Sequence, residues 1–199
     1  MNMENAAYSV SKRTFHYLFW GLLCTQLDLR AEGFDVLLPD WAGYLLIAAG
    51  LRELHVHPAF RAARLLAFLL AGLSLFTFYE TPAATDLFKG YDTFPFLLMI
   101  LDLIMVWQTI GGIMELAKNQ SNAKLADTAQ LRRLLYVAMV ASPMFLSALT
   151  PAQQEFVQDY FYAYLFVALG VKLLLLTLML RAGKELPEPV PPTMQLENG

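Results

Sequence analysis

The chain has 199 residues, of which 57% are hydrophobic and only 16% are charged, and its net charge is −3. Soluble domains contain about 45–50% apolar and about 25% charged residues, so the excess of apolar residues here replaces charge. This composition excludes a disordered chain, a basic nucleic-acid-binding domain and a disulfide-stapled module, and it predicts a membrane protein.

Two short apolar segments come first, Thr14–Leu27 and Val36–Leu51, with a polar stretch between them. A bilayer core of about 30 Å needs about 20 mostly apolar residues per helix, and both segments are at the lower limit of that length. They are compatible with two short transmembrane helices. The alternative is a re-entrant hairpin, which enters and leaves by the same face and needs protein cover for its turn.

Four longer segments follow that are apolar enough to cross a bilayer: Ala59–Tyr79, Phe94–Leu116, Leu131–Thr150 and Phe156–Leu180. Pro58 suits the first turn of the first of these helices. Pro143 lies inside the third, where it should kink the helix and leave a backbone carbonyl for Ser142 or a neighbouring helix to satisfy.

Lysine and arginine are sorted between the two sides of these segments. If all six segments span, eleven of the 14 basic residues fall on one side, two fall on the other, and Lys172 lies within a helix. Basic residues concentrate on the cytoplasmic side. We therefore predict an all-α, polytopic transmembrane bundle of about six helices in the cell (inner) membrane, with both termini in the cytoplasm. Four spanning helices plus an N-terminal re-entrant hairpin would sort the charges in the same way, so that alternative stays open.

This topology divides the chain into three parts. Residues 1–13 form a cytoplasmic N-terminus, residues 14–182 form the transmembrane helical domain, and residues 183–199 form a proline-rich flexible cytoplasmic tail. The proline-rich run in the tail cannot continue a helix, because each proline lacks a backbone N–H and restricts its neighbour.

Asp102 is the most informative polar residue. It lies eight residues into the second long segment, about 12 Å from its start. An acid within the membrane costs about 2.5–3.5 kcal/mol to insert, so its side chain should face protein or water. Thr109 shares its helix face, Gln108 lies close beside it, and the glycine pair 111–112 lets another helix approach. Two interpretations follow, a proton or cation site and a hydrogen-bonded packing acid.

Lys172 is the second charge predicted to lie within the membrane. It is sixteen residues after Phe156, so it lies about 12 Å deeper than Asp102 and a direct ion pair between them is not expected. Glu115, about 32 Å along its own helix, is a nearer match in depth. We expect Lys172 to reach the cytoplasmic headgroups or to pair with Glu115.

Charged residues also gather in the loop that joins the first two segments. They are Asp28, Arg30, Glu32, Asp35 and Asp40. Asp40 follows Pro39, and its carboxylate can accept the free amides of a first helical turn, so we expect it to cap a helix over residues 41–51. The functional alternative for this stretch is an outward-facing binding loop or a re-entrant turn that lines a cavity.

Residues 33–51 read GFDVLLPDWAGYLLIAAGL. This segment resembles small, uncharacterised polytopic membrane proteins of bacteria that share a GFDxLxPDxxGYxLIxxGL-like pattern. The resemblance covers 19 of the 199 residues, and it implies a bacterial cell membrane and no activity. It also implies a structural turn formed by the matching residues Gly33, Asp35, Pro39, Asp40, Gly43 and Tyr44.

The sequence contains none of the common catalytic or nucleotide-binding motifs, including G-x-S-x-G, H-E-x-x-H and the P-loop pattern. We therefore predict no catalytic, cofactor-binding or metal-ligating residues. The predicted function is a non-enzymatic integral membrane protein that binds or scaffolds other membrane proteins or itself, and that does not bind nucleic acid. The alternative is a small proton- or cation-coupled transporter or channel that uses Asp102.

Overall fold

The structure is a computed structural model that describes residues 12–26, 30–31, 34–35, 39–54, 57–78, 93–147 and 161–186. These residues form α1 (Lys12–Gln26), α2 (Asp40–Gly50), α3 (Pro58–Phe78), α5 (Thr93–Asn119), α6 (Ala123–Ser147) and α8 (Phe161–Glu185). Two strands of two residues each, β1 (Arg30–Ala31) and β2 (Phe34–Asp35), pair antiparallel between α1 and α2. The predicted all-α bundle is confirmed, with this ribbon as its small addition.

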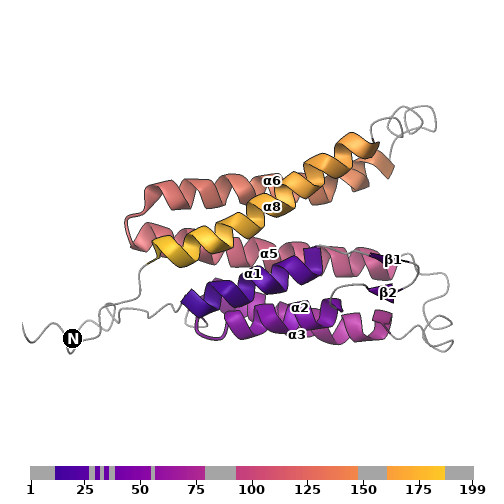
Figure 1. Ribbon diagram of the computed structural model, residues 1–199, viewed down its shortest axis with the longest axis horizontal. Coiled ribbons are helices and arrows are strands. Elements are labelled where there is room, and N and C mark those ends of the chain that lie inside the picture. The colour runs from indigo at the N-terminus through magenta and orange to yellow at the C-terminus, as the bar shows by residue number, and fades with distance from the viewer. Residues whose placement is uncertain are drawn as a thin grey trace, which may run out of the picture.

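The helices form three layers of two, as Figure 1 shows, with α6 and α8 in one outer layer, α1 and α5 in the middle, and α2 and α3 in the other outer layer. Each helix packs mainly against its neighbours in sequence, and α8 returns to pack against α1. The six described helices therefore close into a ring, in which successive helices run in opposite directions.

The two ends of the bundle differ in charge. We call the end where α1 begins and α8 terminates the basic end, and the opposite end, which carries β1 and β2, the ribbon end (Figure 1). Eleven lysines and arginines lie in the parts of the elements that point toward the basic end: Lys12, Arg13, Arg52, Arg61, Arg64, Lys118, Lys124, Arg132, Arg133, Arg181 and Lys184. The sorting predicted along the sequence is thus present in space.

Three helices within the described residues, α3, α5 and α8, are long and apolar enough to cross a membrane. α6 is equally long, but its first half carries Asp127, Arg132 and Arg133, which make it too polar to count as a fourth. α1 has 15 residues and α2 has 11, so they are only about 22 Å and about 16 Å long. They form the side-by-side pair that both sequence interpretations anticipated, and each is shorter than a bilayer core of about 30 Å.

Glycine brings α1 and α2 into close contact. A Cβ atom added to Gly21 would lie 2.7 Å from the carbonyl oxygen of Gly43 and 2.8 Å from the backbone nitrogen of Ile47. A Cβ atom at Gly50 would lie 2.9 Å from the carbonyl oxygen of Thr14. Because these neighbours are backbone atoms, only hydrogen fits at Gly21 and Gly50, and the two backbones approach one another as they do in glycine-mediated membrane helix pairs.

The predicted close approach at the glycine pair of α5 is also confirmed. A Cβ atom at Gly112 would lie 2.5 Å from the ring of Phe60, which begins the buried face of α3. At the preceding residue, Gly111, an added Cβ atom would lie 3.4 Å from the guanidinium of Arg133. The same guanidinium lies 3.3 Å from the centroid of the Trp107 ring, a cation–π contact that joins α5 to α6.

Two local features explain the course of α5 and α6. Ser121 has a φ of 58°, and the amides of Ser121 and Asn122 bond back to the carbonyls of Lys118 and Ala117, which is the Schellman pattern of a helix end. The Asn122 side chain then caps α6 by accepting the amide of Leu125 at 3.0 Å. A tight turn thereby joins the two helices.

Pro143 lies inside α6, where its missing N–H frees the carbonyl of Met139 four residues earlier. The hydroxyl of Ser142 donates to this oxygen at 2.7 Å, and the hydroxyl of Tyr164 on α8 donates to it at 3.3 Å. The predicted rescue of the freed carbonyl by Ser142 or a neighbour is confirmed, and both provide it.

The boundaries of α6 and α8 differ from those expected. α6 begins eight residues before Leu131, because its cap at Asn122 extends the helix through a polar first half. α8 begins five residues after Phe156 and continues to Glu185, three residues into the segment predicted as tail. Gly183 packs against Phe15 of α1, and the side-chain amide of Asn122 donates to Glu185 Oε2 at 3.1 Å, so the last turn of α8 is held in the bundle.

Candidate functional site

The site is a group of polar side chains from five helices that surround Asp102, and we call it the Asp102 cluster. Its members are Gln26 of α1, Tyr44 of α2, Asp102 of α5, Tyr136 of α6 and Lys172 of α8. Tyr136 and Gln26 are buried, and the other three are half-buried. Among the described helices, only α3 contributes no member.

Asp102 accepts hydrogen bonds on both of its carboxylate oxygens. The Tyr136 hydroxyl donates to Oδ2 at 2.7 Å, the Gln26 amide donates to Oδ2 at 3.3 Å, and the Tyr44 hydroxyl donates to Oδ1 at 3.2 Å. Gln26 Nε2 also lies 3.2 Å from the Tyr136 hydroxyl oxygen. A carboxylate inside a membrane protein is costly unless it is compensated, and here side chains from three other helices provide that compensation.

The short lengths of α1 and α2 bring two of these donors to Asp102. Gln26 is the last residue of α1, and Tyr44 is in the second turn of α2. Asp102 is nine residues after the start of α5, about 13 Å from the ribbon end of that helix. α1 and α2 therefore meet α5 partway along its length, which places their polar termini beside the acid.

Lys172 provides a hydrogen-bond donor for the C-terminal end of α1. Its ammonium donates to the carbonyl oxygen of Gln26 at 2.7 Å. The last carbonyls of a helix have no partner within the helix and carry the negative end of its dipole, so a cation is favoured there. Lys172 also attracts the carboxylate of Asp102 electrostatically. Hydrogen bonds thus connect Lys172, Gln26 and Asp102 across three helices.

The expected difference in depth between Lys172 and Asp102 is wrong. α8 begins at Phe161 and α5 at Thr93, so Lys172 is eleven residues into its helix and Asp102 is nine residues into its own. The two lie at depths that differ by about 3 Å. Glu115 is 22 residues from the start of α5, much nearer the basic end, where its carboxylate lies 3.9 Å from His57.

The other residues predicted near Asp102 lie elsewhere. Thr109 is buried, but its hydroxyl donates to the carbonyl of Met105 in its own helix at 2.8 Å. Within the described residues, no hydrogen bond joins Gln108 or Thr109 to the cluster. Proximity along α5 therefore does not place Gln108 or Thr109 in the cluster. The hydrogen-bond donors to Asp102 come from other helices instead.

The predicted outer loop is described only in part. Asp28 and Glu32 lie outside the described residues. Arg30 and Asp35 face one another in the register of the two-stranded ribbon. Asp40 does not precede its helix as expected. It is the first helical residue, and the preceding Pro39 makes no side-chain capping bond. Its carboxylate lies in the first turn of α2, where a negative charge interacts favourably with the positive end of the helix dipole.

Three members of the cluster were missed by sequence reasoning, namely Gln26, Tyr44 and Tyr136. A signal existed for Tyr136, since it interrupts an apolar run and a buried tyrosine hydroxyl needs a partner. Gln26 lies near the end of a short segment, and Tyr44 lies within the other short segment, where neither residue is unusual. Only their hydrogen bonds to Asp102 and Tyr136 show that both belong to the cluster.

The chemistry available at the cluster is that of a carboxylate, two phenols, an amide and an ammonium. These groups can hold helices together or exchange a proton. Within the described part of the chain, no group of three histidine, cysteine or acidic side chains could hold a metal ion. Comparison of the chain with protein-family models, curated proteins and solved structures finds no match, so the interpretation of this membrane protein depends on its own geometry.

Proposed function

We propose that the protein is a non-enzymatic membrane protein that binds a transmembrane helix of a partner protein through the ribbon-end half of α8. One observation carries this proposal. No residue from Ala163 to Gly170 is buried, whereas half of residues 171–186 are buried against α1 and α6. The ribbon-end half of α5 also lacks buried residues, but most of its residues are half-buried, whereas five of the eight residues 163–170 are exposed.

Exposure in this half of α8 extends around the helix. Leu165, Phe166 and Val167 are 46%, 76% and 64% exposed, and successive positions on a helix are separated by about 100°. Figure 1 shows α6 and α8 rising away from α1 and α5 toward the ribbon end. This part of α8 therefore presents a broad apolar surface at the edge of the bundle.

Gly170 supports an apolar helix as the occupant of this surface. A Cβ atom at Gly170 would meet nothing within 4 Å. Ala163 and Val167 lie on the same helix face as Gly170, seven and three residues earlier. Small residues on a membrane helix let a second helix approach closely, and this packing drives helix association where lipid already satisfies the apolar surface.

The proposal includes a location, the cell (inner) membrane of a bacterium with both termini in the cytoplasm. The basic end supports this orientation, because it carries eleven of the 14 lysines and arginines of the chain. Such an excess is typical of the cytoplasmic side. α8 would then contact its partner in the half of the bilayer farther from the cytoplasm.

A photo-crosslinking amino acid at position 166 tests this proposal in native membranes. The same probe at Leu65 of α3, which is 67% exposed, serves as the matched control. We expect a discrete protein adduct from the probe at Phe166 and only lipid adducts from the probe at Leu65. When the probe at position 166 is combined with Gly170→Leu, the adduct should disappear, because the larger side chain separates α8 from the partner helix. Gly72→Leu is the control, since Gly72 also has open space around it, and it should leave the adduct unchanged.

Two results would contradict partner binding. Lipid adducts alone at position 166 would show that α8 faces only the bilayer. An adduct of twice the mass of the chain, which persists when the purified protein is crosslinked, would assign this surface to self-association instead.

A second candidate, proton- or cation-coupled transport, is favoured by the connected polar groups of the Asp102 cluster. Lys172, Gln26, Asp102 and Tyr136 form consecutive hydrogen bonds inside the bundle. If this function holds, the purified protein in liposomes with a pH or cation gradient shows flux, and Asp102→Asn abolishes it while Asp127→Asn, on the exposed face of α6, does not. Absence of flux in the wild-type protein, or full flux in Asp102→Asn, rejects the role of Asp102.

A further inference from the structure

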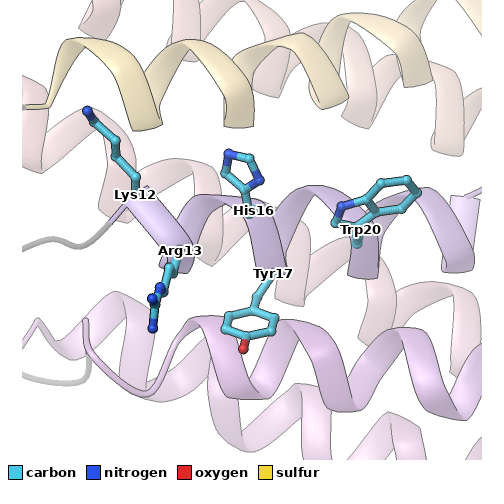
Figure 2. A pocket seen from close by; sticks show the side chains of 5 residues that line it. All are labelled: Lys12, Arg13, His16, Tyr17 and Trp20. Carbon is cyan, nitrogen blue, oxygen red and sulfur yellow. The ribbon is translucent and has the colours of Figure 1, made fainter.

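The exposed face of α1 carries a cavity of about 400 Å³ at the basic end of the bundle. Its lining side chains are Lys12, Arg13, His16, Tyr17 and Trp20. They all come from the first nine residues of one helix, as Figure 2 shows, and none of them belongs to the Asp102 cluster.

The spacing of these residues follows the helix. Lys12, His16 and Trp20 are four residues apart and lie on the side of α1 that faces α8, whereas Arg13 and Tyr17 lie on the side that faces α2 (Figure 2). The cavity therefore extends along the helix between two rows of side chains. From Lys12 to Trp20 it covers about 12 Å, beginning at the basic end and leading toward the middle of the bundle.

The chemistry of the lining changes along that length. At the basic end, an ammonium and a guanidinium supply positive charge and only hydrogen-bond donors, and the His16 imidazole lies beside them. Toward the middle, Tyr17 and Trp20 are 46% and 53% exposed and present ring faces with one polar atom each. Donors and positive charge favour a phosphate, and exposed amphipathic rings are typical of the boundary between headgroups and acyl chains.

We propose that this cavity binds an anionic phospholipid, with its phosphate at the basic end near Lys12 and Arg13 and its glycerol and upper acyl chains against Tyr17 and Trp20. A lipid fits better than a soluble phosphate, because the charged and aromatic parts are arranged in the order in which a phospholipid presents its groups. The cavity also opens on the outside of the bundle, where the lipid bilayer would be.

Native mass spectrometry of the full-length protein in detergent tests this site. The protein is titrated with phosphatidylglycerol and with phosphatidylcholine of the same acyl chains. We expect phosphatidylglycerol to bind about tenfold more tightly than phosphatidylcholine, because basic residues near a membrane surface attract anionic lipids. The double variant Lys12→Gln/Arg13→Gln should remove most of that preference.

The matched control is Lys118→Gln/Lys124→Gln, which removes the same charge from exposed positions at the same end of the bundle. It should retain the preference for phosphatidylglycerol within about twofold, because it leaves the cavity intact. Three results would overturn the proposal. They are equal binding of the two lipids, equal loss in both double variants, and displacement of phosphatidylglycerol by millimolar inorganic phosphate, which would assign the cavity to a soluble anion.

Discussion

Replacing Asp102 with alanine should lower the free energy of unfolding in detergent by about 3 kcal/mol. The change removes the acceptor of three hydrogen bonds, from the hydroxyls of Tyr136 and Tyr44 and the amide of Gln26, and leaves the side chains of Tyr136 and Gln26 only their bond to each other. Interhelical hydrogen bonds in membrane proteins contribute about 0.6 to 1.7 kcal/mol each, which gives this total. Equilibrium unfolding in sodium dodecyl sulfate, followed by circular dichroism, measures the change.

Two comparisons make this result specific to the cluster. Asp127→Ala removes an acid from an exposed position on α6 and should change stability by less than about 0.5 kcal/mol. Tyr136→Phe keeps the acid but loses its shortest hydrogen bond and should cost about 1 kcal/mol. If Asp102→Ala and Asp127→Ala were equally mild, Asp102 would not hold the helices together.

Substitution of Gly21 by alanine should have a comparable effect, a loss of about 3 kcal/mol in the same assay. The added Cβ would approach the carbonyl oxygen of Gly43 at 2.7 Å and the backbone nitrogen of Ile47 at 2.8 Å. Backbone atoms within a helix cannot rotate away as a side chain can, so α1 and α2 would have to separate. That separation would also move Gln26 and Tyr44, the polar residues that these two helices bring to Asp102.

Gly170→Ala and Gly72→Ala are the matched controls for this prediction. Each lies within a helix with nothing within 4 Å of the new Cβ. Alanine favours a helix over glycine by about 0.5–1 kcal/mol, so both controls should be neutral or slightly stabilising. The same substitution, glycine to alanine, is thus expected to lower stability at Gly21 and to leave it unchanged or raise it slightly at Gly170 and Gly72. A similar loss of stability at all three positions would contradict the prediction, because it would not depend on the contact between α1 and α2.

Hydrophobic length predicted the long helices well, because α3 and α5 begin within one residue of the expected positions. It failed for α8 in a way that affected the site. Counting from Phe156 instead of Phe161 placed Lys172 too deep and separated it from Asp102. A five-residue error in one helix start is about 7.5 Å of depth, enough to place at different depths two charges that lie at nearly the same depth.

Asp102 itself could be identified from sequence, because an acid in an apolar run is costly and therefore conspicuous. Its hydrogen-bond partners could not be identified from the sequence. Gln26 and Tyr44 are ordinary residues in their local sequence, and Tyr136 shows that it needs a partner but not which one. The three residues lie 76, 58 and 34 residues from Asp102 along the chain. Helical periodicity reports which residues share a face of one helix, as for Thr109, but it contains no information about which helices lie opposite that face.

The contact between α8 and α1 determines when the molecule can be completed during synthesis. α1, which carries Phe15 and Gln26, is made before the other described helices, whereas α8, which carries their partners Gly183 and Lys172, is made after them. Until α8 is in place, the terminal carbonyl of α1 lacks its ammonium donor. The described helices therefore form an open row that closes into a ring only when α8 packs against α1.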